Sequence, residues 1–509
     1  MAGDLYFSGQ KTDRTLFQDR ASRLAADMRA RGVGPDDVIA VLMRNDTAFM
    51  AVAEAARLVG ARYAAINWHA APLEIQHILE DSGAALLYGH SDLLPPVMPS
   101  IPAGVTVISA RVPPAISDAY GVAHVPVHGT LAMADVIETT APFEGPAEKF
   151  RGMFAYTSGS TGRPKGIKRI IDPDAPDRWE SYGLIASMLL GIQPRDSMYF
   201  SAPLYHSAPN ALATMCLAAG AVDVFIDPKF DAEGFLRTIQ DHRITHAYMV
   251  PTMMIRLLKL PEAVRNRYNV SSLRFTISTG SPCPADVKKA MIEWFGPVIH
   301  ESYGASEIGF MTLITSEEAL AKPGSVGKIL PGGAVKVLDD DFNEVPAGQT
   351  GLLYVHLPTF GDYEYTNVDG SLGGQRQGAF STVGDVGHVD EDGYIFISDR
   401  KKDMIISGGA NIFPAEIEAH LIQMPDILDC AVFGAPDAEF GEIVAAAVTC
   451  KPGKTVTLES VRTFLEPRLA RFKLPRILDV HDELPRQDSG KVFKQKLRAS
   501  YWEAVDRDI

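Results

Sequence analysis

The residue types best suited to binding an anion occur in one glycine- and hydroxyl-rich segment, Tyr156-Thr-Ser-Gly-Ser-Thr-Gly-Arg-Pro-Lys-Gly-Ile-Lys168. Glycines let backbone N–H groups turn toward an anion, hydroxyl groups add donors, and Lys165 adds a positive charge. The segment is not a Walker A loop, because Pro164 precedes the lysine and Gly166 follows it. Such a loop is, by itself, more often a surface linker. The Lys-Gly ending after the apolar strand pattern Met153–Tyr156 favours phosphate binding.

Two later segments carry side chains suited to adenine and to a metal ion. In Glu301-Ser-Tyr-Gly-Ala-Ser-Glu307, the tyrosine ring can stack on adenine, and the carboxylate of Glu307 can hold Mg²⁺ near phosphates. Alone, this segment would be a turn that carries a buried tyrosine. Just upstream lies a second small-residue loop, Ser278-Thr-Gly-Ser-Pro282.

An aspartate and an arginine farther along the chain have the chemistry to bind a ribose. Asp385 ends the run Ser381-Thr-Val-Gly-Asp385, and Arg400 follows Asp399. A carboxylate is a natural bidentate acceptor for a vicinal diol. In isolation these two residues would be a turn aspartate and a surface arginine.

Near the end of the chain, a lysine closes the run Leu484-Pro-Arg-Gln-Asp-Ser-Gly-Lys491. A terminal lysine is by itself almost always solvated. Taken together and in this order, however, the segments resemble the adenylate-forming superfamily of acyl-CoA synthetases, nonribosomal adenylation domains and firefly-type luciferases. The resemblance covers nearly the whole chain and is carried by several separate motifs.

The resemblance implies a role for each matched residue. Lys491, Thr157 and Glu307 would be catalytic, and Thr157 and Glu307 would also hold Mg²⁺. The residues matching ATP contacts are Ser158, Gly159, Ser160, Thr161, Gly162, Lys165, Gly280, Ser281, Pro282, Ser302, Tyr303, Gly304, Asp385 and Arg400. Those matching the segment beside CoA are Ser407, Gly408 and Gly409, and those matching the acid pocket are His206, Asn210, Ala305 and Gly309.

By the same resemblance, the chain divides at a hinge. Lys402 would be that hinge, between an acid- and ATP-binding domain of residues 1–401 and a mobile C-terminal domain of residues 402–509 that carries Lys491. The segment Ser407–Glu418 would border the pantetheine tunnel. The superfamily often has Arg-Gly-Glu-Asn where this chain has Gly408-Gly-Ala-Asn411, which leaves the CoA contacts open.

The implied reaction uses ATP, Mg²⁺ and coenzyme A in two halves. A carboxylate first attacks the α-phosphorus of ATP, giving an acyl-adenylate and pyrophosphate; the small domain then rotates, and a thiol forms acyl-CoA and AMP. Alternatives are a stand-alone enzyme that loads a carrier-protein phosphopantetheine, a luciferase-like oxygenase, and a catalytically silent nucleotide-binding regulator. The presence of Lys165, Glu307, Asp385 and Lys491 argues against the silent regulator.

By the same resemblance, most residues expected to line the acid pocket are small or apolar. The residues expected to line it, namely Pro203–Asn210, Met249–Thr252, Gly304, Ala305, Gly309 and Phe310, include no Lys or Arg for a second carboxylate. The first segment also lacks an acidic residue for an α-amino group. A hydrophobic monocarboxylic acid is therefore predicted, with fatty, aryl-propenoic and steroid side-chain acids all open.

Charge and composition limit the partners of this 509-residue chain. Lys and Arg number 48 and Asp and Glu 63, so the net charge is 48 − 63 = −15, which argues against general nucleic-acid binding. Because ATP and CoA are themselves anionic, positive side chains should gather around the cleft, namely Lys165, Lys168, Arg169, Arg400 and Lys491. We expect small-molecule partners only, and a monomer or homodimer.

Several features favour the cytoplasm. The four cysteines are widely spaced, without a metal-ligand pattern, and are expected to be reduced thiols. The N-terminal residues lack the features of a signal peptide. The apolar stretch Ala211–Ile226 is shorter than the roughly 20 residues that cross a bilayer.

The elements that must position these residues follow from periodicity. Helix-like spacing from Leu16 to Met28, the strand pattern Val38–Met43, a helix at Phe49–Leu58 and the strand pattern Tyr63–Ile66 alternate, which predicts a mostly parallel sheet. Residues 93–127 are rich in proline and predict loops and short strands.

The remaining elements predict a second kind of architecture. Short antiparallel strands are expected at Gly348–Pro358 and Gly384–Ser398. The expected later elements are a helix at Ala415–Met424, strands at Ile427–Phe433 and Glu442–Thr449, and a helix at Leu458–Leu469. The predicted fold is therefore α/β: a large N-terminal region of parallel αβ layers plus a distorted β-barrel, with a small mobile α+β C-terminal domain.

Overall fold

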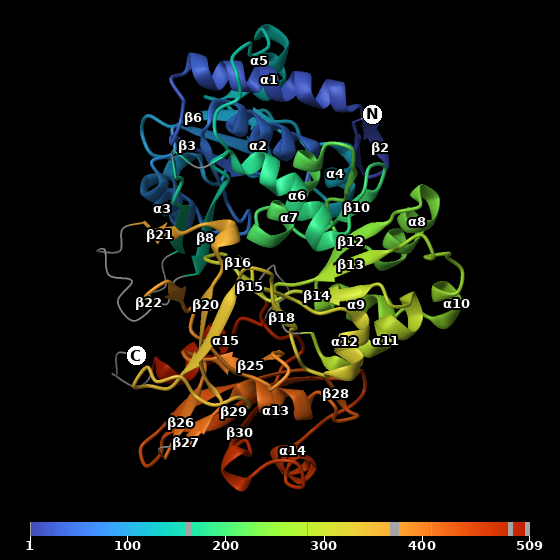
Figure 1. The fold of residues 1–509 in the computed structure, drawn as a ribbon, viewed down its shortest axis with the longest axis vertical. Coiled ribbons are helices and arrows are strands. Elements are labelled where there is room, and N and C mark those ends of the chain that lie inside the picture. The colour runs from blue at the N-terminus through green and yellow to red at the C-terminus, as the bar shows by residue number, and fades with distance from the viewer. Residues whose placement is uncertain are drawn as a thin grey trace. The chain divides into compact units, whose positions relative to one another are not determined.

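The chain forms two compact units in a computed structural model (Figure 1). Unit 1 comprises Met1–Leu320 and Leu357–Ser371, and unit 2 comprises Ala321–His356 and Leu372–Ile509. The structure describes residues 2–158, 164–172, 174, 176–281, 283–366, 376–408, 410–486 and 492–503. The division into domains at 401/402 stays a prediction.

Unit 1 contains an eight-stranded sheet whose order is β21-β9-β8-β4-β3-β5-β6-β7. In that order the strands are Tyr363–Tyr365, Pro164–Arg169, Met153–Ser158, Arg62–Ala65, Val38–Leu42, Leu86–His90, Thr106–Ala110 and Leu131–Ala132. The strands from β8 to β7 are parallel, whereas β9 and β21 continue the sheet antiparallel. The accompanying helices are α1 (Arg14–Ala30), α2 (Thr47–Val59), α3 (Pro72–Ser82), α4 (Pro114–Tyr120) and α5 (Met133–Thr139), with a 3₁₀ turn η1 at Met98–Ser100.

A seven-stranded sheet forms the other layer of unit 1, in the order β14-β13-β12-β10-β11-β1-β2. The strands are Ile299–Glu301, Phe275–Ser278, His246–Met249, Ser197–Phe200, Asp223–Ile226, Leu5–Phe7 and Gln10–Thr12, and only β2 is antiparallel. Its helices are α6 (Arg178–Leu190), α7 (Ser207–Ala219), α8 (Ala232–His242), α9 (Pro251–Leu258), α10 (Glu262–Arg265), α11 (Ala285–Phe295) and α12 (Ser316–Ala321). The short elements β15 (Gly304–Ala305), β16 (Gly309–Phe310), β17 (Thr312–Leu313) and η2 (Pro358–Phe360) complete unit 1.

Unit 2 begins with an antiparallel sheet of six strands, in which β19 pairs with β20 beside the row β22-β23-β20-β24-β25. These strands are β19 (Ala334–Leu338), β20 (Gly351–His356), β22 (Arg376–Gln377), β23 (Phe380–Ser381), β24 (Asp385–Val389) and β25 (Ile395–Arg400), preceded by β18 (Lys328–Ile329). Val337, Leu353 and Ile395 are its buried core.

The last part of unit 2 is a five-stranded sheet covered by helices. The long strands β28 (Ile427–Asp437) and β29 (Gly441–Cys450) pair antiparallel, joined by β26 (Ile405–Ser407), β27 (Ala410–Ile412) and β30 (Ile477–Val480). The helices are α13 (Pro414–Leu421), α14 (Leu458–Leu465) and α15 (Lys494–Trp502), with η3 at Arg471–Lys473. Apolar side chains from both faces of the sheet, such as Val432 and Phe433, are buried.

The sequence patterns agree with these elements because the apolar periods are strong. The predicted strand at 38–43 is β3, and its residues are fully buried as a parallel strand between helices requires. The predicted helix at 49–58 is α2, which ends at Gly60 in the left-handed conformation with φ 74°. The prediction of loops and short strands for residues 93–127 was incomplete: helix α4 lies within this proline-rich stretch, and it begins at Pro114, where proline is tolerated.

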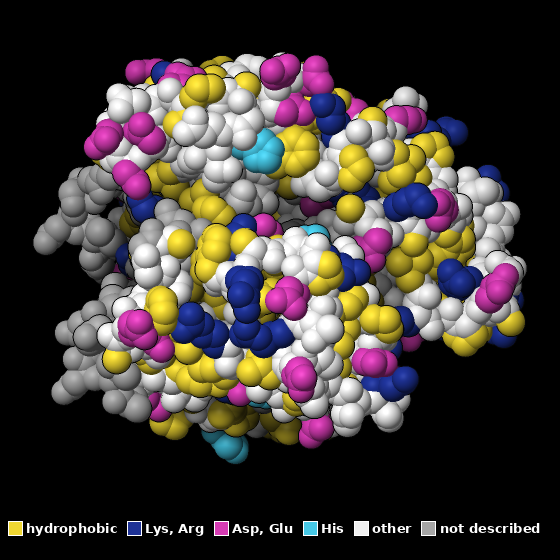
Figure 2. Space-filling model, turned by 90° about the horizontal axis from the view of Figure 1, so that it is seen from below, with side chains coloured by type: hydrophobic (Ala, Val, Ile, Leu, Met, Phe, Trp, Pro, Cys, Tyr) yellow, Lys and Arg dark blue, Asp and Glu magenta, His cyan; other side chains and the backbone are white. Residues whose placement is uncertain are grey.

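The mixed α/β architecture of the prediction, with a large N-terminal and a small C-terminal part, is confirmed. No helix among the described residues is long and apolar enough to cross a membrane. On the face shown in Figure 2, Lys and Arg side chains are interspersed with Asp, Glu and apolar side chains. All four cysteines carry free thiols.

Candidate active site

The phosphate-loop segment lies on an antiparallel hairpin of β8 and β9. Its register pairs Thr157 with Lys165 and Ser158 with Pro164. The predicted residues Gly159, Ser160, Thr161 and Gly162 lie outside the described residues, as do the side chains of Thr157 and Ser158. The backbone therefore fixes the two ends of the loop and the strand position of Lys165.

Helix α3 supports the base of this hairpin. The Nε2 atom of His77 lies 3.1 Å from the carbonyl oxygen of Pro164. The Tyr156 hydroxyl donates to Asp81 Oδ2 at 2.7 Å, and the Thr366 hydroxyl donates to the same oxygen at 2.5 Å. Burial, together with the hydrogen bond to Asp81, raises the pKa of Tyr156, so its hydroxyl remains a proton donor.

The two adenine-side loops lie at the carboxyl ends of neighbouring parallel strands. Strands β13 and β14 pair with Ser278 opposite Glu301, and the backbone N–H of Ser302 donates to the Ser278 carbonyl at 2.9 Å. The Tyr303 N–H donates to Thr312 Oγ1 at 3.1 Å. In open parallel sheets this edge is where ligands bind. Gly280 and Ser281 lie in the first loop, whereas Pro282 lies outside the described residues.

A buried ion pair fastens the start of the second loop. Lys288 on α11 binds Glu301 on β14, and each residue is 4% exposed. Burial raises the pKa of Glu301, and the charge of Lys288 opposes that shift. Two full charges at this depth are tolerated because they neutralise each other.

Glu307 occupies the turn of a second hairpin. Strands β15 and β16 pair Ala305 with Gly309, so that residues 306–308 form the turn. Gly309 has φ +95°, and a Cβ there would lie 2.6 Å from the Phe360 ring, so glycine is required. This three-residue turn fixes the backbone of Glu307.

Two side chains contact Glu307 directly. The Tyr365 hydroxyl donates to Glu307 Oε1 at 2.9 Å. The Arg169 guanidinium donates to the carbonyl of Glu307, to that of Ser306 at 2.8 Å and to that of Gly361 at 3.3 Å. Burial lowers the pKa of Arg169, and its contacts with carbonyl oxygens satisfy its charge.

The segment expected to line the acid pocket is held by amide side chains. Asn45 Nδ2 donates to the carbonyl of Ala202 at 2.9 Å, and the Leu204 N–H donates to Asn45 Oδ1 at 2.8 Å. Asn210 donates to the Leu204 carbonyl at 2.8 Å and accepts from the Tyr63 hydroxyl at 2.5 Å. Both amides are 3% exposed, so they shape this segment from within.

His206 immediately precedes α7, where it occupies the N-cap position. The next residue, Ser207, shares a hydrogen bond of 2.8 Å with the hydroxyl of Ser306, next to Glu307. The predicted pocket residues His206, Ala305 and Gly309 therefore belong to two segments joined by that bond.

In unit 2, Asp385 and Arg400 are brought together. They lie opposite each other on β24 and β25, and Arg400 Nε donates to Asp385 Oδ1 at 3.1 Å. Asp385 is 4% exposed, so its carboxylate is neutralised by the adjacent guanidinium. The predicted ribose contacts are thus a preformed pair.

The predicted hinge residue and the segment predicted to lie beside CoA also belong to unit 2. The Lys402 carbonyl accepts from Arg498 Nη1 at 3.4 Å. Ser407 ends β26, and Gly408 has φ +56° with its N–H donating to the Phe440 carbonyl at 2.8 Å. The predicted Gly409 and Lys491 lie outside the described residues.

Residues on both sides of the segment 487–491, which lies outside the described residues, are anchored. Arg486 and Val492 form a bridge, and the Phe493 N–H donates to the Pro485 carbonyl at 2.7 Å. Lys494 Nζ binds Glu418 Oε1 at 2.8 Å. Burial lowers the pKa of Lys494, but the charges of Glu418, Asp399 and Asp403 together with the hydrogen bond to Glu418 outweigh burial and raise the pKa, so this anchor is charged at neutral pH.

Comparison with known proteins places this arrangement in a family. Residues 5–361 match the AMP-binding enzyme family, and residues 416–491 match the AMP-binding enzyme C-terminal domain. The chain belongs to the AMP-binding enzyme family. This confirms the predicted membership of the adenylate-forming superfamily.

Named relatives of this AMP-binding enzyme match almost its full length. An indoleacetate–CoA ligase of Aromatoleum aromaticum is 32% identical over 94% of this chain and 90% of its own. A feruloyl-CoA synthase of an Amycolatopsis species is 31% identical over 95% and 92%. A long-chain-fatty-acid–CoA ligase of Mycobacterium tuberculosis is 31% identical over 96% and 92%.

Solved structures agree with the fold of this AMP-binding enzyme. ATP-bound MatB from Rhodopseudomonas palustris has a TM-score of 0.84 at 26% identity, covering 99% of this chain and 97% of that one. An anthranilate CoA ligase in complex with anthranoyl-AMP has a TM-score of 0.85 at 24% identity, covering 99% and 95%. The latter likeness concerns the fold alone.

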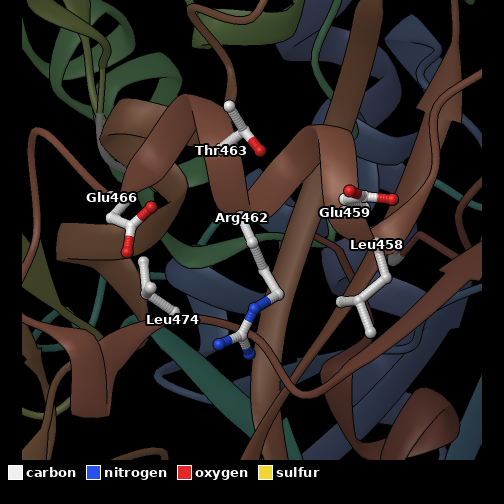
Figure 3. A pocket seen from close by; sticks show the side chains of 6 residues that line it. All are labelled: Leu458, Glu459, Arg462, Thr463, Glu466 and Leu474. Carbon is white, nitrogen blue, oxygen red and sulfur yellow. The ribbon is translucent and has the colours of Figure 1, made fainter.

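A surface hollow in unit 2 of the AMP-binding enzyme has a volume of about 430 Å³. It is lined by Leu458, Glu459, Arg462 and Thr463 of α14 and by Glu466 and Leu474, which follow that helix in the chain (Figure 3). Arg462 donates to the Pro475 carbonyl at 2.9 Å. The hollow includes none of the residues predicted to bind ATP or the acid.

Sequence motifs did not identify several residues that position the site of this AMP-binding enzyme. Asp81, Lys288, Asn45 and Tyr365 belong to no motif, and Arg169 was expected only as a positive charge near the cleft. The sequence did not single out Lys288, because Lys289 beside it is also a lysine and is exposed. Its partner Glu301 could not be inferred, because sequence spacing does not reveal contacts between elements.

Proposed function

We propose that this AMP-binding enzyme activates a hydrophobic monocarboxylic acid with ATP and transfers it to coenzyme A, giving acyl-CoA, AMP and pyrophosphate. The observation that carries this proposal is the joint support of the phosphate-loop hairpin and Glu307 by β9 and β21 within unit 1. The hairpin proposed to bind the phosphates and the carboxylate proposed to bind the metal ion are thus both held by β9 and β21. The relatives above are named as CoA ligases, in agreement with this reaction.

The residues fit Mg²⁺ in the manner usual for ATP enzymes. Within the described residues, no three His, Cys, Asp or Glu side chains converge as a metal-binding group. Mg²⁺ is commonly held by one or two carboxylates plus substrate phosphates, so Glu307 with the Thr157 hydroxyl would suffice. The ion supplies charge neutralisation between the attacking carboxylate and the phosphates.

In the first half-reaction, the chain's own groups hold ATP and neutralise charge. Thr157, Ser158, Ser160, Thr161 and Lys165 bind the β- and γ-phosphates. Tyr303 stacks on adenine beside Gly280, Ser281, Pro282, Ser302 and Gly304, and Asp385 with Arg400 holds the ribose. Lys491 bridges the acid carboxylate and the α-phosphate, where negative charge accumulates as the bond forms.

In the second half-reaction, the C-terminal domain turns about Lys402. Lys491 leaves the adenylate, and Ser407, Gly408 and Gly409 come to border the path of the thiol. AMP is an activated leaving group, so the thioester step needs mainly positioning of the thiol against the carbonyl carbon.

The acid pocket favours an apolar acid. His206, Ala305 and Gly309 line it in this proposal, and Asn210 shapes it through Leu204. The relatives act on indoleacetate, ferulate and long-chain fatty acids by their names, so aryl and fatty acids are the first two classes to test. The compartment is proposed to be the cytoplasm, in keeping with four free thiols, and the enzyme to be a monomer or homodimer.

A second acceptor has one specific observation in its favour. A fatty acid–[acyl-carrier-protein] ligase of Streptomyces coeruleorubidus is 30% identical over 96% of this chain and 92% of its own. Release of AMP with CoA and no carrier protein supports the CoA ligase. Release that depends on a phosphopantetheinylated carrier protein favours the alternative.

The decisive test separates the two half-reactions with the variant Lys491→Ala. We expect loss of pyrophosphate release by about 10²- to 10³-fold, as for removal of one preorganised charge contact, with thioester formation from supplied acyl-adenylate retained. The assay measures pyrophosphate release across fatty, aryl and steroid side-chain acids, then acyl-CoA by chromatography. Equal loss of both half-reactions would contradict the role given to Lys491. ATP binding without pyrophosphate release from any acid would support the silent regulator instead.

A further inference from the structure

Arg169 makes an unusual set of contacts for a strand residue. It lies at the end of β9, and its guanidinium donates hydrogen bonds to the backbone carbonyls of Ser306, Glu307 and Gly361. Two of these carbonyls belong to the turn that carries Glu307. A planar guanidinium can bind several carbonyls at once, which an ammonium cannot do with the same geometry. Arg169 therefore fixes the turn as a rigid body.

Tyr365 acts on the side chain of the same glutamate. Its hydroxyl donates to Glu307 Oε1 at 2.9 Å, and it lies on β21. A hydrogen bond to one carboxylate oxygen restrains the rotamer of the side chain and the orientation of the carboxylate plane. Groups of this kind behind a metal ligand typically alter metal affinity by 10- to 100-fold.

Arg169 and Tyr365 belong to one ribbon that also carries the phosphate-loop lysine. Strands β9 and β21 pair antiparallel, with Arg169 opposite Tyr363 and Ile167 opposite Tyr365. Lys165 and Arg169 are four residues apart on β9, so their side chains leave the same face of the strand. The distance from the phosphate-binding lysine to the glutamate turn is thereby set by strand geometry.

We propose that Arg169 and Tyr365 are positioning residues that hold Glu307 for Mg²⁺ and couple metal binding to nucleotide binding at the phosphate-loop hairpin. This inference rests on the proposed function, in which Glu307 binds Mg²⁺. Arg169 sets the backbone of Glu307 and Tyr365 sets its carboxylate. Neither residue touches the substrate in this scheme.

Three variants of Arg169 and Tyr365 and one control variant distinguish the contributions of the individual contacts. Tyr365→Phe removes one hydroxyl and leaves the ring. Arg169→Met removes all the carbonyl contacts, and Arg169→Lys keeps the charge but not the planar fork. The matched control is Tyr268→Phe, because the Tyr268 hydroxyl donates to Glu233 Oε1 at 2.6 Å, a bond of the same kind between a loop and α8.

The readout is the binding of a non-hydrolysable ATP analogue by calorimetry, with and without Mg²⁺. For Tyr365→Phe and Arg169→Met we expect the strengthening of binding by Mg²⁺ to fall about tenfold, with metal-free binding changed less than about twofold. Arg169→Lys should lie between wild type and Arg169→Met, and Tyr268→Phe should equal wild type. Thermal unfolding confirms that each variant is folded, and Tyr365→Phe alone decides the matter if Arg169→Met does not fold.

Unchanged Mg²⁺ dependence in Tyr365→Phe and in both folded Arg169 variants would overturn the proposal. Equal weakening with and without Mg²⁺ would also overturn it, because a general disturbance of the site would then explain the result. Failure of the proposed function gives a different result: wild type itself would show no strengthening by Mg²⁺ and no pyrophosphate release. If Mg²⁺ strengthens nucleotide binding in wild type and equally in the variants, only the positioning roles of Arg169 and Tyr365 are contradicted.

Discussion

Two glutamates in one seven-residue motif have opposite surroundings. Glu301 ends a parallel strand, is 4% exposed and is bound by the ammonium of Lys288. Glu307 lies in a hairpin turn, is only partly buried, and receives the neutral hydroxyl of Tyr365. The first carboxylate is bound directly by an ammonium group inside the protein, whereas the second is bound by a neutral hydroxyl, with the Arg169 guanidinium on its backbone carbonyl.

This difference separates a structural carboxylate from one that we propose to bind a metal ion. A buried carboxylate that is paired with a cation is compatible with a stable folded state only while both partners are present. A carboxylate held by a neutral donor keeps its charge for a cation from outside. The Asp385–Arg400 pair in unit 2 is an intermediate case, because the aspartate is buried but the arginine side chain is 41% exposed.

The largest effect is expected from Lys288→Met. It leaves Glu301 as an uncompensated buried carboxylate, so the free energy of unfolding should fall by about 3–5 kcal/mol. Because burial raises the pKa of Glu301 already, protonation relieves the isolated carboxylate, and the loss should shrink as pH falls. Chemical denaturation at several pH values measures both effects.

The control for that experiment is the double variant Lys288→Met with Glu301→Gln. Removing both charges should restore most of the lost stability, because no unpaired charge remains at the site. A double variant as unstable as Lys288→Met would show that lost packing, and not the stranded charge, causes the effect.

Glu307→Gln should have a smaller effect on stability and a large one on catalysis. We expect pyrophosphate release to fall by about 10²-fold or more, since the metal-binding charge is lost while the amide can still accept from Tyr365. The free energy of unfolding should change by less than about 0.5 kcal/mol, as for most substitutions outside a core. A stability loss comparable to that of Lys288→Met would erase the distinction between the two glutamates.

A pH effect is expected from His300, which precedes Glu301 and stacks on Phe275 with ring centroids 4.1 Å apart. Burial lowers its pKa from 6.5 to about 4. The native state therefore binds the proton less well than the unfolded chain, so stability is complete above pH 6.5 and is lost as pH falls toward 4. The loss amounts to about 2–3 kcal/mol.

His300→Phe should remove this part of the pH dependence while keeping the stacking on Phe275. Denaturation of wild type and variant at several pH values between 4 and 7 gives the free energy of unfolding at each pH. Above pH 6.5 this free energy should change with pH by the same amount in both proteins. Parallel curves across the whole range would show that His300 does not titrate in the expected way.

Much of the fold was predictable because its apolar periods are strong. The strand at 38–43, the helix at 49–58 and the helix in the segment 415–424 have buried faces that recur at the expected spacing. The proline-rich stretch concealed α4, because proline at a helix start has no periodic signal of its own. The residue roles carried by the motifs remain predictions.

The sequence by itself determined the family, the order of the motifs and the chemical type of each candidate group. Hydroxyls, glycines and Lys165 have the chemistry to bind an anion, and Glu307 has the chemistry to bind a cation or a hydrogen-bond donor. Tertiary structure alone decided which of the two motif glutamates is neutralised, because Lys288, Arg169 and Tyr365 reach their partners from other elements. Such contacts depend on how helices and strands pack, and the spacing of residues along the chain does not give the distance between two residues in space.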